Sequence, residues 1–416
     1  MHWVKHESAV IWCALHLQYC PFMMKNHLSL STALPLDAPD ALLIGRVWVD
    51  GSGPVLALID ATSVFDLSSV AATSSQLLEL PDVARRVRQA AASLPRLAGT
   101  EEVLGNSSAR DPQLPWLLAP CDLQAIKAAG VTFVASMLER VIEEQARGDA
   151  SKAEAVRAAV VNVMGDNLSS IRPGSPEAAR LKDVLIAQGV WSQYLEVGIG
   201  PDAEIFTKSQ PLSAVGTGAE VGIHPQSVWN NPEPEIVLAV NSRGETVGAA
   251  LGNDVNLRDF EGRSALLLGK AKDNNASCAI GPFIRLFDEH FNIDQVRQSD
   301  LTMTVTGPET PTPFTMTGGS SLKKISRDPL DLVAQACGAN HQYPDGFMLF
   351  LGTMFAPTQD RHGPGQGFTH VVGDVVAVST PQLGTLVNRV TTSDKAAPWT
   401  FGIAALMKSL AKRRLL

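Results

Sequence analysis

The sequence is poor in cysteine and in charge, and both shortages limit the kind of protein it can be. Its five cysteines, among 416 residues, are odd in number and none are spaced like the close pairs of zinc sites. They suit reduced, mostly buried thiols in a cytoplasmic protein. Charged residues make up only 18%, the net charge is −8, and no basic block stands out. We therefore expect no nucleic-acid partner, because little is available to neutralise phosphates.

Long apolar runs are also lacking. Residues 9–24 are apolar, but His16, Gln18 and Pro21 interrupt them. This run is too short to cross a membrane, and it has no small-residue cleavage site. We expect no membrane partner, and we expect residues 1–30 to be a disordered extension of the folded protein.

Common catalytic signatures are missing as well. The sequence has no Gly-x-Ser-x-Gly elbow, no phosphate-binding Gly-x-x-x-x-Gly-Lys-Ser/Thr loop and no dinucleotide fingerprint after a strand. The nine histidines are scattered, and four of them precede residue 30. Nucleophilic catalysis and nucleotide binding therefore find little support.

The hydrophobic content of 45% can fill a large core and allows two domains. Residues 31–118 are expected to form a small N-terminal domain. In it, residues 41–70 alternate around Gly51-Ser-Gly53 like a hairpin, residues 75–95 look helical, and the Pro- and Gly-containing segment 96–120 looks like a linker.

Residues 119–416 are expected to form the catalytic domain. Helices are predicted at 135–147 and 330–337, and a helical insertion at 150–190 would contain helices at 152–164 and 176–188. From residue 203 onward short strand patterns dominate, separated by Asp, Asn, Gly and Pro. The pattern indicates an α+β fold whose second half is largely antiparallel sheet.

Two glutamates separated by one residue are the most informative feature. Glu233 and Glu235 precede the apolar run 236–240, and Pro234 between them favours an extended backbone. Side chains two residues apart on a strand point to the same face. A lone Glu-x-Glu most often only solvates the face of an edge strand.

Asp254 follows in a second strand-turn segment, Gly252-Asn-Asp254. By itself this is ordinary turn chemistry. Three carboxylates that converge and leave room for water and substrate are, however, typical of an open Mg²⁺ or Mn²⁺ site. The combination predicts metal-dependent chemistry on a small 2-oxo acid.

Candidate partners for the substrate lie in three further segments. Lys270 and Lys272 precede an Asn-rich turn, where a lysine could hold a carboxylate or transfer a proton. The Gly-rich segment 317–321 could supply a substrate contact. A third group shares one face of the predicted helix 135–147, although such a group is often only a surface ion-pair array: Ser136, Glu139, Arg140 and Glu143.

Taken together, these motifs resemble the fumarylacetoacetate hydrolase family over residues 120–405. The similarity is carried by an ordered set of short segments: Gly130-Val-Thr-Phe133, Phe206-Thr-Lys208, Pro232-Glu-Pro-Glu235, Gly252–Asp259, Lys272 with Gly281-Pro, Gly352-Thr353 and Gly373-Asp374. The resemblance implies a mixed β-roll and metal-ligand roles for Glu233, Glu235 and Asp254.

One departure separates this chain from many members of the family. Where they carry His-x-x-Glu, this sequence has Ser136-x-x-Glu139. The loss of the water-activating base argues against hydrolysis and favours the sugar-acid dehydratase branch. Within that branch the resemblance is closest to the 2-keto-3-deoxy-D-xylonate dehydratases, through the segments 131–133, 138–144, 191–196 and 264–282.

The resemblance implies a hydro-lyase that converts a 2-keto-3-deoxy pentonate to 2-oxoglutarate semialdehyde with Mg²⁺ or Mn²⁺, as a homodimer or homotetramer. The implied catalytic residues are Glu139, Glu143 and Lys272, the last favoured over Lys270 by its spacing from Asp254. The implied substrate-binding residues are Ser136, Arg140, Lys208, Ser321 and Thr353. Three alternatives stay open: a 2-keto-3-deoxy-L-arabonate dehydratase, an acylpyruvate or fumarylacetoacetate-type hydrolase, and a non-catalytic sugar-acid-binding protein.

Overall fold

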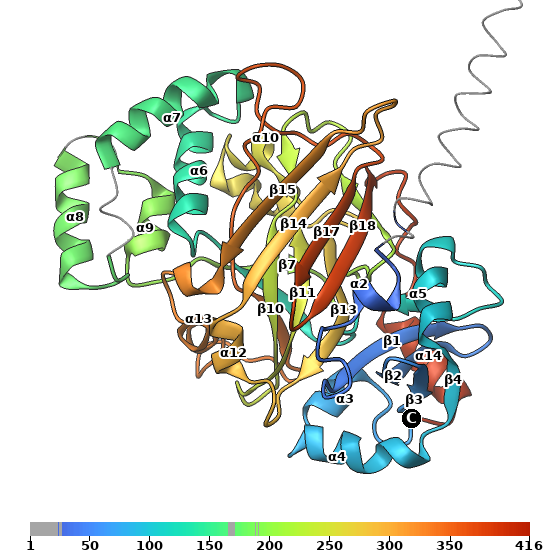
Figure 1. Ribbon diagram of the computed structural model, residues 1–416. Helices are drawn as coiled ribbons and strands as arrows, with labels where there is room; N and C mark the ends of the chain where they lie inside the picture. Colours follow the sequence, from blue (N-terminus) through green and yellow to red (C-terminus); the bar gives the residue numbers. More distant parts are fainter. Residues whose placement is uncertain (1–23, 25–26, 165–170, 188, 190) are drawn as a thin grey trace, which may run out of the picture.

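The computed structural model describes residues 24, 27–164, 171–187, 189 and 191–416 (Figure 1). Most of the expected N-terminal extension, residues 1–23 and 25–26, lies outside the described residues. Met24 and Leu28 are buried in a small cluster with Val375, Ala377 and Val387. Among the described residues, no helix combines the length and apolar character needed to span a membrane.

The N-terminal region begins with an antiparallel meander, which confirms the hairpin expected around Gly51. Its strands are β1 (Leu43–Val49), β2 (Gly53–Ile59), β3 (Ser63–Asp66), β4 (Arg96–Gly99) and β5 (Trp116–Leu118). The helical stretch near 75–95 is confirmed as three short pieces: α3 (Ser74–Leu78), α4 (Val83–Ala90) and the 3₁₀ turn η1 (Ala91–Ser93).

The expected linker at 96–120 is wrong. This segment holds β4, the ten-residue helix α5 (Thr100–Ala109) and β5. Val103 and Leu104 of α5 pack into a core cluster with strand residues of β1 and β2. Tertiary burial therefore overrides the Pro and Gly content from which a linker was predicted.

A single eleven-stranded sheet runs through both regions, in the order β4-β3-β2-β1-β13-β11-β10-β16-β6-β7, with β5 paired to β1. Its remaining strands are β6 (Ala125–Ala129), β7 (Ile205–Ser209), β10 (Pro234–Val240), β11 (Thr246–Asp254), β13 (Cys278–Leu286) and β16 (Phe347–Phe350). Because β1 pairs with β13, the N-terminal strands extend the sheet of the rest of the chain.

A second sheet of five strands lies over the first, in the order β15-β14-β17-β18-β8 (Figure 1). Its members are β8 (Glu220–Ile223), β14 (Asp300–Thr306), β15 (Thr315–Ser321), β17 (Val375–Thr380) and β18 (Gly384–Thr392). The pair β9 (Asn230–Asn231) and β12 (Asn256–Leu257) forms a third, small sheet. Pairing is antiparallel except between β16 and β6 and between β18 and β8, which confirms the largely antiparallel α+β expectation.

Four helices project from one side of the sheets and form what we call the cap (Figure 1). They are α6 (Val134–Gln145), α7 (Ala150–Met164), α8 (Pro176–Ala187) and α9 (Gln193–Ile199). The first three confirm the predicted helices, whereas α9 was not predicted. Met137, Val141, Leu195 and Trp229 belong to the apolar cluster that holds the cap together.

The remaining helices are short except for α13 and α14. They are α2 (Leu30–Ala33), α10 (Arg258–Glu261), η3 (Ala265–Leu267), α11 (Leu268–Lys272), α12 (Ile293–Arg297), η4 (Leu322–Lys324), α13 (Pro329–Ala336) and α14 (Ile403–Lys412). Helix α13 confirms the prediction at 330–337. Helix α14 was not predicted, and it lies against β2.

Candidate active site

The site begins where β10 and β11 lie side by side at the edge of the cap. The register pairs Pro234 with Asn253 and Glu235 with Gly252, so Glu233 lies opposite Asp254. The Asp254 amide donates to the Glu233 carbonyl at 3.0 Å. Strand pairing thus brings the Glu-x-Glu segment and Asp254 together, although the sequence separates them.

The three carboxylates converge as predicted. One oxygen from each of Glu233, Glu235 and Asp254 can be chosen so that all three lie within 4.8 Å of one another. Each of the three side chains is at most 2% exposed. Both glutamates therefore point to the same side of the strand, and they point inward rather than into solvent.

Each of these carboxylates is held by a neighbour from another element. Glu235 accepts from the Gly352 amide at 2.7 Å and from the Thr353 hydroxyl at 3.1 Å. Gly352 has φ +99°, and a Cβ there would lie 2.0 Å from the Thr132 hydroxyl oxygen, so this approach requires glycine. Glu233 and Asp254 are held by cations instead.

Lys272, at the end of α11, bridges two of the carboxylates. Its Nζ donates to Glu233 at 2.6 Å and to Asp254 at 3.2 Å, and its side chain is 3% exposed. Burial by itself would lower the pKa of Lys272, but the negative charges of Asp254 and Glu233 outweigh it and raise this pKa. Lys270 is exposed. Of the two lysines, the structure therefore brings Lys272 to the site, as its spacing from Asp254 predicted.

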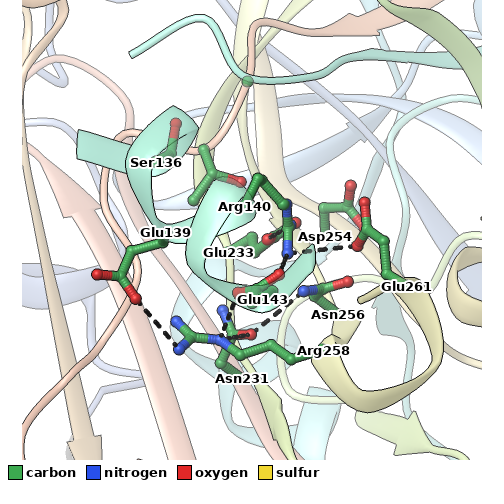
Figure 2. A network of polar contacts seen from close by, with 12 residues as sticks. Ser136, Glu139, Arg140, Glu143, Asn231, Glu233, Asp254, Asn256, Arg258 and Glu261 are labelled. Atoms are coloured by element: carbon green, nitrogen blue, oxygen red, sulfur yellow. Dashed lines mark hydrogen bonds and ion pairs between the residues drawn. The ribbon is translucent and has the colours of Figure 1, made fainter. Parts of the chain in front are cut away.

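The polar face of α6 lies across the carboxylates, with four residues lining the cavity as their helical spacing predicted (Figure 2). Arg140 links α6 to the carboxylates. Its guanidinium donates to Glu233 and lies 2.5 Å from Glu143 and 3.3 Å from Glu261. The Ser136 hydroxyl donates to the Phe133 carbonyl at 2.9 Å, within its own turn.

Glu139 and Glu143 are engaged by arginines outside the cavity. Arg157 of α7 donates to Glu139 at 2.8 Å. The Arg258 Nε lies 3.3 Å from Glu143, and another nitrogen of Arg258 lies 3.7 Å from Glu139 (Figure 2). Both expected catalytic glutamates are therefore members of ion pairs.

The cavity between α6 and the strands is small, about 20 Å³. This is room for one or two water molecules. Its lining is strongly acidic, and all of it comes from the part of the chain that follows the N-terminal region: Ala129, Gly130, Val131, Ser136, Glu139, Arg140, Glu143, Glu204, Phe206, Glu233, Glu235, Asp254, Glu261, Lys272, Thr353 and Ala356.

Burial and neighbouring charge separate the acidities of these carboxylates. Burial next to Asp254 and Glu233 raises the pKa of Glu235 well above its usual value. Burial alone would also raise the pKa of Glu233, but Arg140 and Lys272 outweigh it and lower this pKa to about 2. Burial raises the pKa of Glu143 although Arg140 and Arg258 oppose the shift.

Glu204 and Glu261 line the cavity and were missed from the sequence. Burial, and then the negative charge of Glu261, raise the pKa of Glu204 to about 7. Gly130 makes space for it, because a Cβ there would lie 1.8 Å from a Glu204 carboxylate oxygen. Neither glutamate carried a motif: Glu204 immediately precedes β7, and Glu261 ends α10.

Lys208 and Ser321 are not in the lining of this cavity. The Lys208 side chain is 0% exposed and lies behind the carboxylates, with Nζ 2.7 Å from Asp254. Ser321 ends β15, and the Gly-rich segment 317–321 is strand rather than the substrate-contact loop that was expected. A run of Gly and Ser does not distinguish a loop from an edge strand when pairing is unknown.

The donor set and the charge fit a divalent cation. Seven carboxylates line the cavity, and five cations contact them, namely Arg140, Arg157, Lys208, Arg258 and Lys272, which leaves −2 when all are ionised. Carboxylate oxygens are the ligands that Mg²⁺ and Mn²⁺ prefer. Three of them desolvated side by side repel one another, and a cation among them would offset that repulsion.

Comparison with known proteins agrees with this geometry. Residues 193–391 match the family model described as fumarylacetoacetate (FAA) hydrolase C-terminal. A probable 2-keto-3-deoxyxylonate dehydratase of Haloferax volcanii is 27% identical over 349 residues, covering 83% of this chain and 98% of that protein. A 2-dehydro-3-deoxy-D-arabinonate dehydratase of Saccharolobus solfataricus is 28% identical over 187 residues, 45% of this chain and 58% of that protein.

Solved structures show the same fold. A 2-keto-3-deoxy-D-arabinonate dehydratase complexed with magnesium and 2,5-dioxopentanoate aligns with a TM-score of 0.56 at 18% identity, covering 84% of this chain and 99% of that one. A fumarylacetoacetate hydrolase from Exiguobacterium antarcticum aligns with a TM-score of 0.51 at 16% identity, covering 85% and 100%. Residues 193–391 thus match the fumarylacetoacetate hydrolase family, and these solved structures share the fold of the chain.

Proposed function

We propose that this protein is a hydro-lyase that removes water from a 2-keto-3-deoxy pentonate and forms 2-oxoglutarate semialdehyde, with Mg²⁺ as its cofactor. The observation that carries the proposal is the buried convergence of Glu233, Glu235 and Asp254 beside Lys272 and Arg140. The relative from Haloferax volcanii, which this chain covers almost entirely, carries the same activity in its name.

The substrate's configuration reduces to one stereocentre. A keto group at C2 and a deoxy carbon at C3 remove two of the stereocentres of the parent sugar acid, and C4 is left. The D-xylonate and D-arabinonate series have the same configuration there, so their 2-keto-3-deoxy acids are one compound. We propose the D enantiomer, and the L-arabonate-derived enantiomer is the rival.

The metal would be held by Glu233, Glu235 and Asp254. When bound there, Mg²⁺ supplies a positive charge that stabilises the negative charge developing on the keto oxygen of the substrate. Mn²⁺ is the second candidate, because oxygen ligands suit both ions.

The substrate carboxylate is an anion and needs a cation at the site. Arg140 and Lys272 are the two cations that line the cavity, and both already contact carboxylates there. Arg140 presents a planar fork suited to a carboxylate. The hydroxyls of Ser136 and Thr353 line the same cavity and are placed to bond the substrate's oxygen atoms.

Proton transfer was expected from Glu139 or Glu143, and we now favour Glu204. Glu139 is fixed by Arg157, and Glu143 lies between Arg140 and Arg258. Glu204 lines the cavity, forms no ion pair within the part of the chain that the structure describes, and has a pKa raised to about 7 by burial and by the charge of Glu261. A carboxylate of that acidity can take and return a proton near neutral pH.

The proposed reaction balances as a loss of one water molecule. Glu204 removes a proton from C3, and the hydroxyl on C4 leaves with a proton as water. The electron pair of the C3–H bond becomes the new double bond. Proton shifts then convert the unsaturated alcohol to the aldehyde of 2-oxoglutarate semialdehyde, with no oxidant or reductant consumed.

The deciding experiment supplies both enantiomers of the 2-keto-3-deoxy pentonate with Mg²⁺ and follows the semialdehyde through a coupled dehydrogenase, with an EDTA control. Metal-dependent product from the D enantiomer is expected. Pyruvate release from acetylpyruvate would favour hydrolysis instead. Tight binding of the keto acid without turnover would favour a sugar-acid-binding protein.

The assembly and location implied by the resemblance belong to the same proposal: a homodimer or homotetramer in the cytoplasm. Light scattering coupled to size-exclusion chromatography tests the first. A monomeric mass at micromolar concentration would contradict it.

A further inference from the structure

Lys208 occupies an unusual place behind the candidate metal ligands. It lies on β7, its side chain is 0% exposed, and its ammonium has three partners. Nζ lies 2.7 Å from Oδ1 of Asp254, and it donates to the Lys272 carbonyl at 2.6 Å and to the Val255 carbonyl at 3.3 Å. Two of its three N–H donors serve these carbonyls, and the contact with Asp254 is an ion pair without a hydrogen bond.

In this arrangement, one carboxylate oxygen of Asp254 contacts Lys208 and the other contacts Lys272. Oδ1 is paired with Lys208 behind the site, whereas Oδ2 lies 3.2 Å from Nζ of Lys272 on the cavity side. A cation bound by both oxygens would have to approach the Lys208 ammonium, which repels it. A cation bound by Oδ2 alone stays clear of Lys208, and it would take the place of the 3.2 Å contact that Lys272 makes with that oxygen.

Divalent cations differ in how they use a carboxylate. Ca²⁺ takes six to eight oxygens at about 2.3–2.6 Å and readily accepts both oxygens of one carboxylate, whereas Mg²⁺ takes a compact octahedron at about 2.0–2.1 Å. A site whose aspartate can offer only one oxygen therefore disfavours Ca²⁺ more than Mg²⁺.

We propose that Lys208 is a positioning residue that restricts Asp254 to one-oxygen coordination and so sets the preference of this site for Mg²⁺ over Ca²⁺. The inference rests on the metal site of the proposed function. The hydrogen bond from Lys208 to the Lys272 carbonyl also fixes the end of α11, and Lys272 is the lysine that lines the cavity. The sequence-based substrate-binding role for Lys208 is replaced by this one.

The test replaces Lys208 with Met, which has a similar length and no charge, and measures the dissociation constants of Mg²⁺ and Ca²⁺ by isothermal titration calorimetry. Loss of a positive charge strengthens the binding of both ions equally, so the informative quantity is their ratio. We expect the ratio to move toward Ca²⁺ by about ten-fold or more, the size of effect that residues holding metal ligands have. The same shift is expected in Lys208→Gln, which serves if the Met variant does not fold.

The matched control is Lys127→Met. Lys127 lies on β6, the neighbour of β7, and donates to the Thr207 hydroxyl at 2.9 Å without contacting a carboxylate of the cavity. In the Lys127→Met variant, the ratio of the Mg²⁺ and Ca²⁺ dissociation constants should equal that of the wild type. A ratio within two-fold of wild type in both Lys208 variants overturns this inference alone, whereas a wild type that binds no Mg²⁺ overturns the metal site itself.

Discussion

Arg140 of the cap and Glu233 of the sheet are in direct contact although 93 residues separate them along the chain. The same guanidinium also reaches Glu143 and Glu261. The position of α6 is therefore tied to the charge of the candidate metal ligands. Arg140, Glu143, Glu233 and Glu261 all line the cavity of about 20 Å³.

Replacing Arg140 with Met should destabilise the protein strongly. Three buried carboxylates would lose their shared counter-ion, and breaking a buried pair typically costs about 3–5 kcal/mol. Urea denaturation followed by circular dichroism measures the loss. The control is Arg180→Met on α8, whose pair with Glu177 is exposed to solvent and should contribute little to stability. Equal stability of the two variants would contradict the prediction.

Glu204→Gln should lower kcat by about 10²–10⁴-fold, the usual contribution of a general base. Because a base must be ionised to act, the wild-type kcat/KM should rise as pH rises through about 7, the pKa of Glu204. That rise should be absent in the variant, while Mg²⁺ affinity is retained. Glu139→Gln serves as the comparison, and a larger loss there would return proton transfer to Glu139.

Mg²⁺ should stabilise the wild type and not Glu235→Gln. Burial beside Asp254 and Glu233 raises the pKa of Glu235, so a neutral amide should be tolerated in EDTA. With Mg²⁺ at a hundred times its Kd, the wild type should gain about 2.7 kcal/mol, seen as a higher Tm. A Mg²⁺-dependent gain of the same size in the variant would remove Glu235 from the ligand set.

Among the cysteines that the structure describes, Cys337 should react first with iodoacetamide. It is partly exposed, whereas Cys121 and Cys278 are buried, and burial raises the pKa of Cys121 to about 12. The thiolate is the reactive form, so both buried thiols should stay unmodified in the native protein at pH 8. Peptide mapping by mass spectrometry after brief labelling provides the measurement. Early modification of Cys278 would show that the β13 region opens.

What the sequence determined by itself follows from local geometry. Side chains two residues apart on a strand point to the same face, so Glu233 and Glu235 could be predicted to act as a pair. Helical spacing placed Ser136, Glu139, Arg140 and Glu143 on one face before the cavity beneath them was known. The cap helices α6, α7 and α8 were predictable for the same reason, since their patterns depend only on near neighbours.

Only the tertiary structure decided which charges meet. Glu204 and Glu261 come from separate elements and belong to no motif, so their approach to the cavity depends on strand order and register. Lys208 lies in a motif of the resemblance, but its contact with Asp254 was visible only in the structure. Arg157 of α7 and Arg258 of α10 likewise turn the two expected catalytic glutamates into ion pairs. The acidity of a carboxylate depends on its burial and its charged neighbours, and spacing along a chain carries neither.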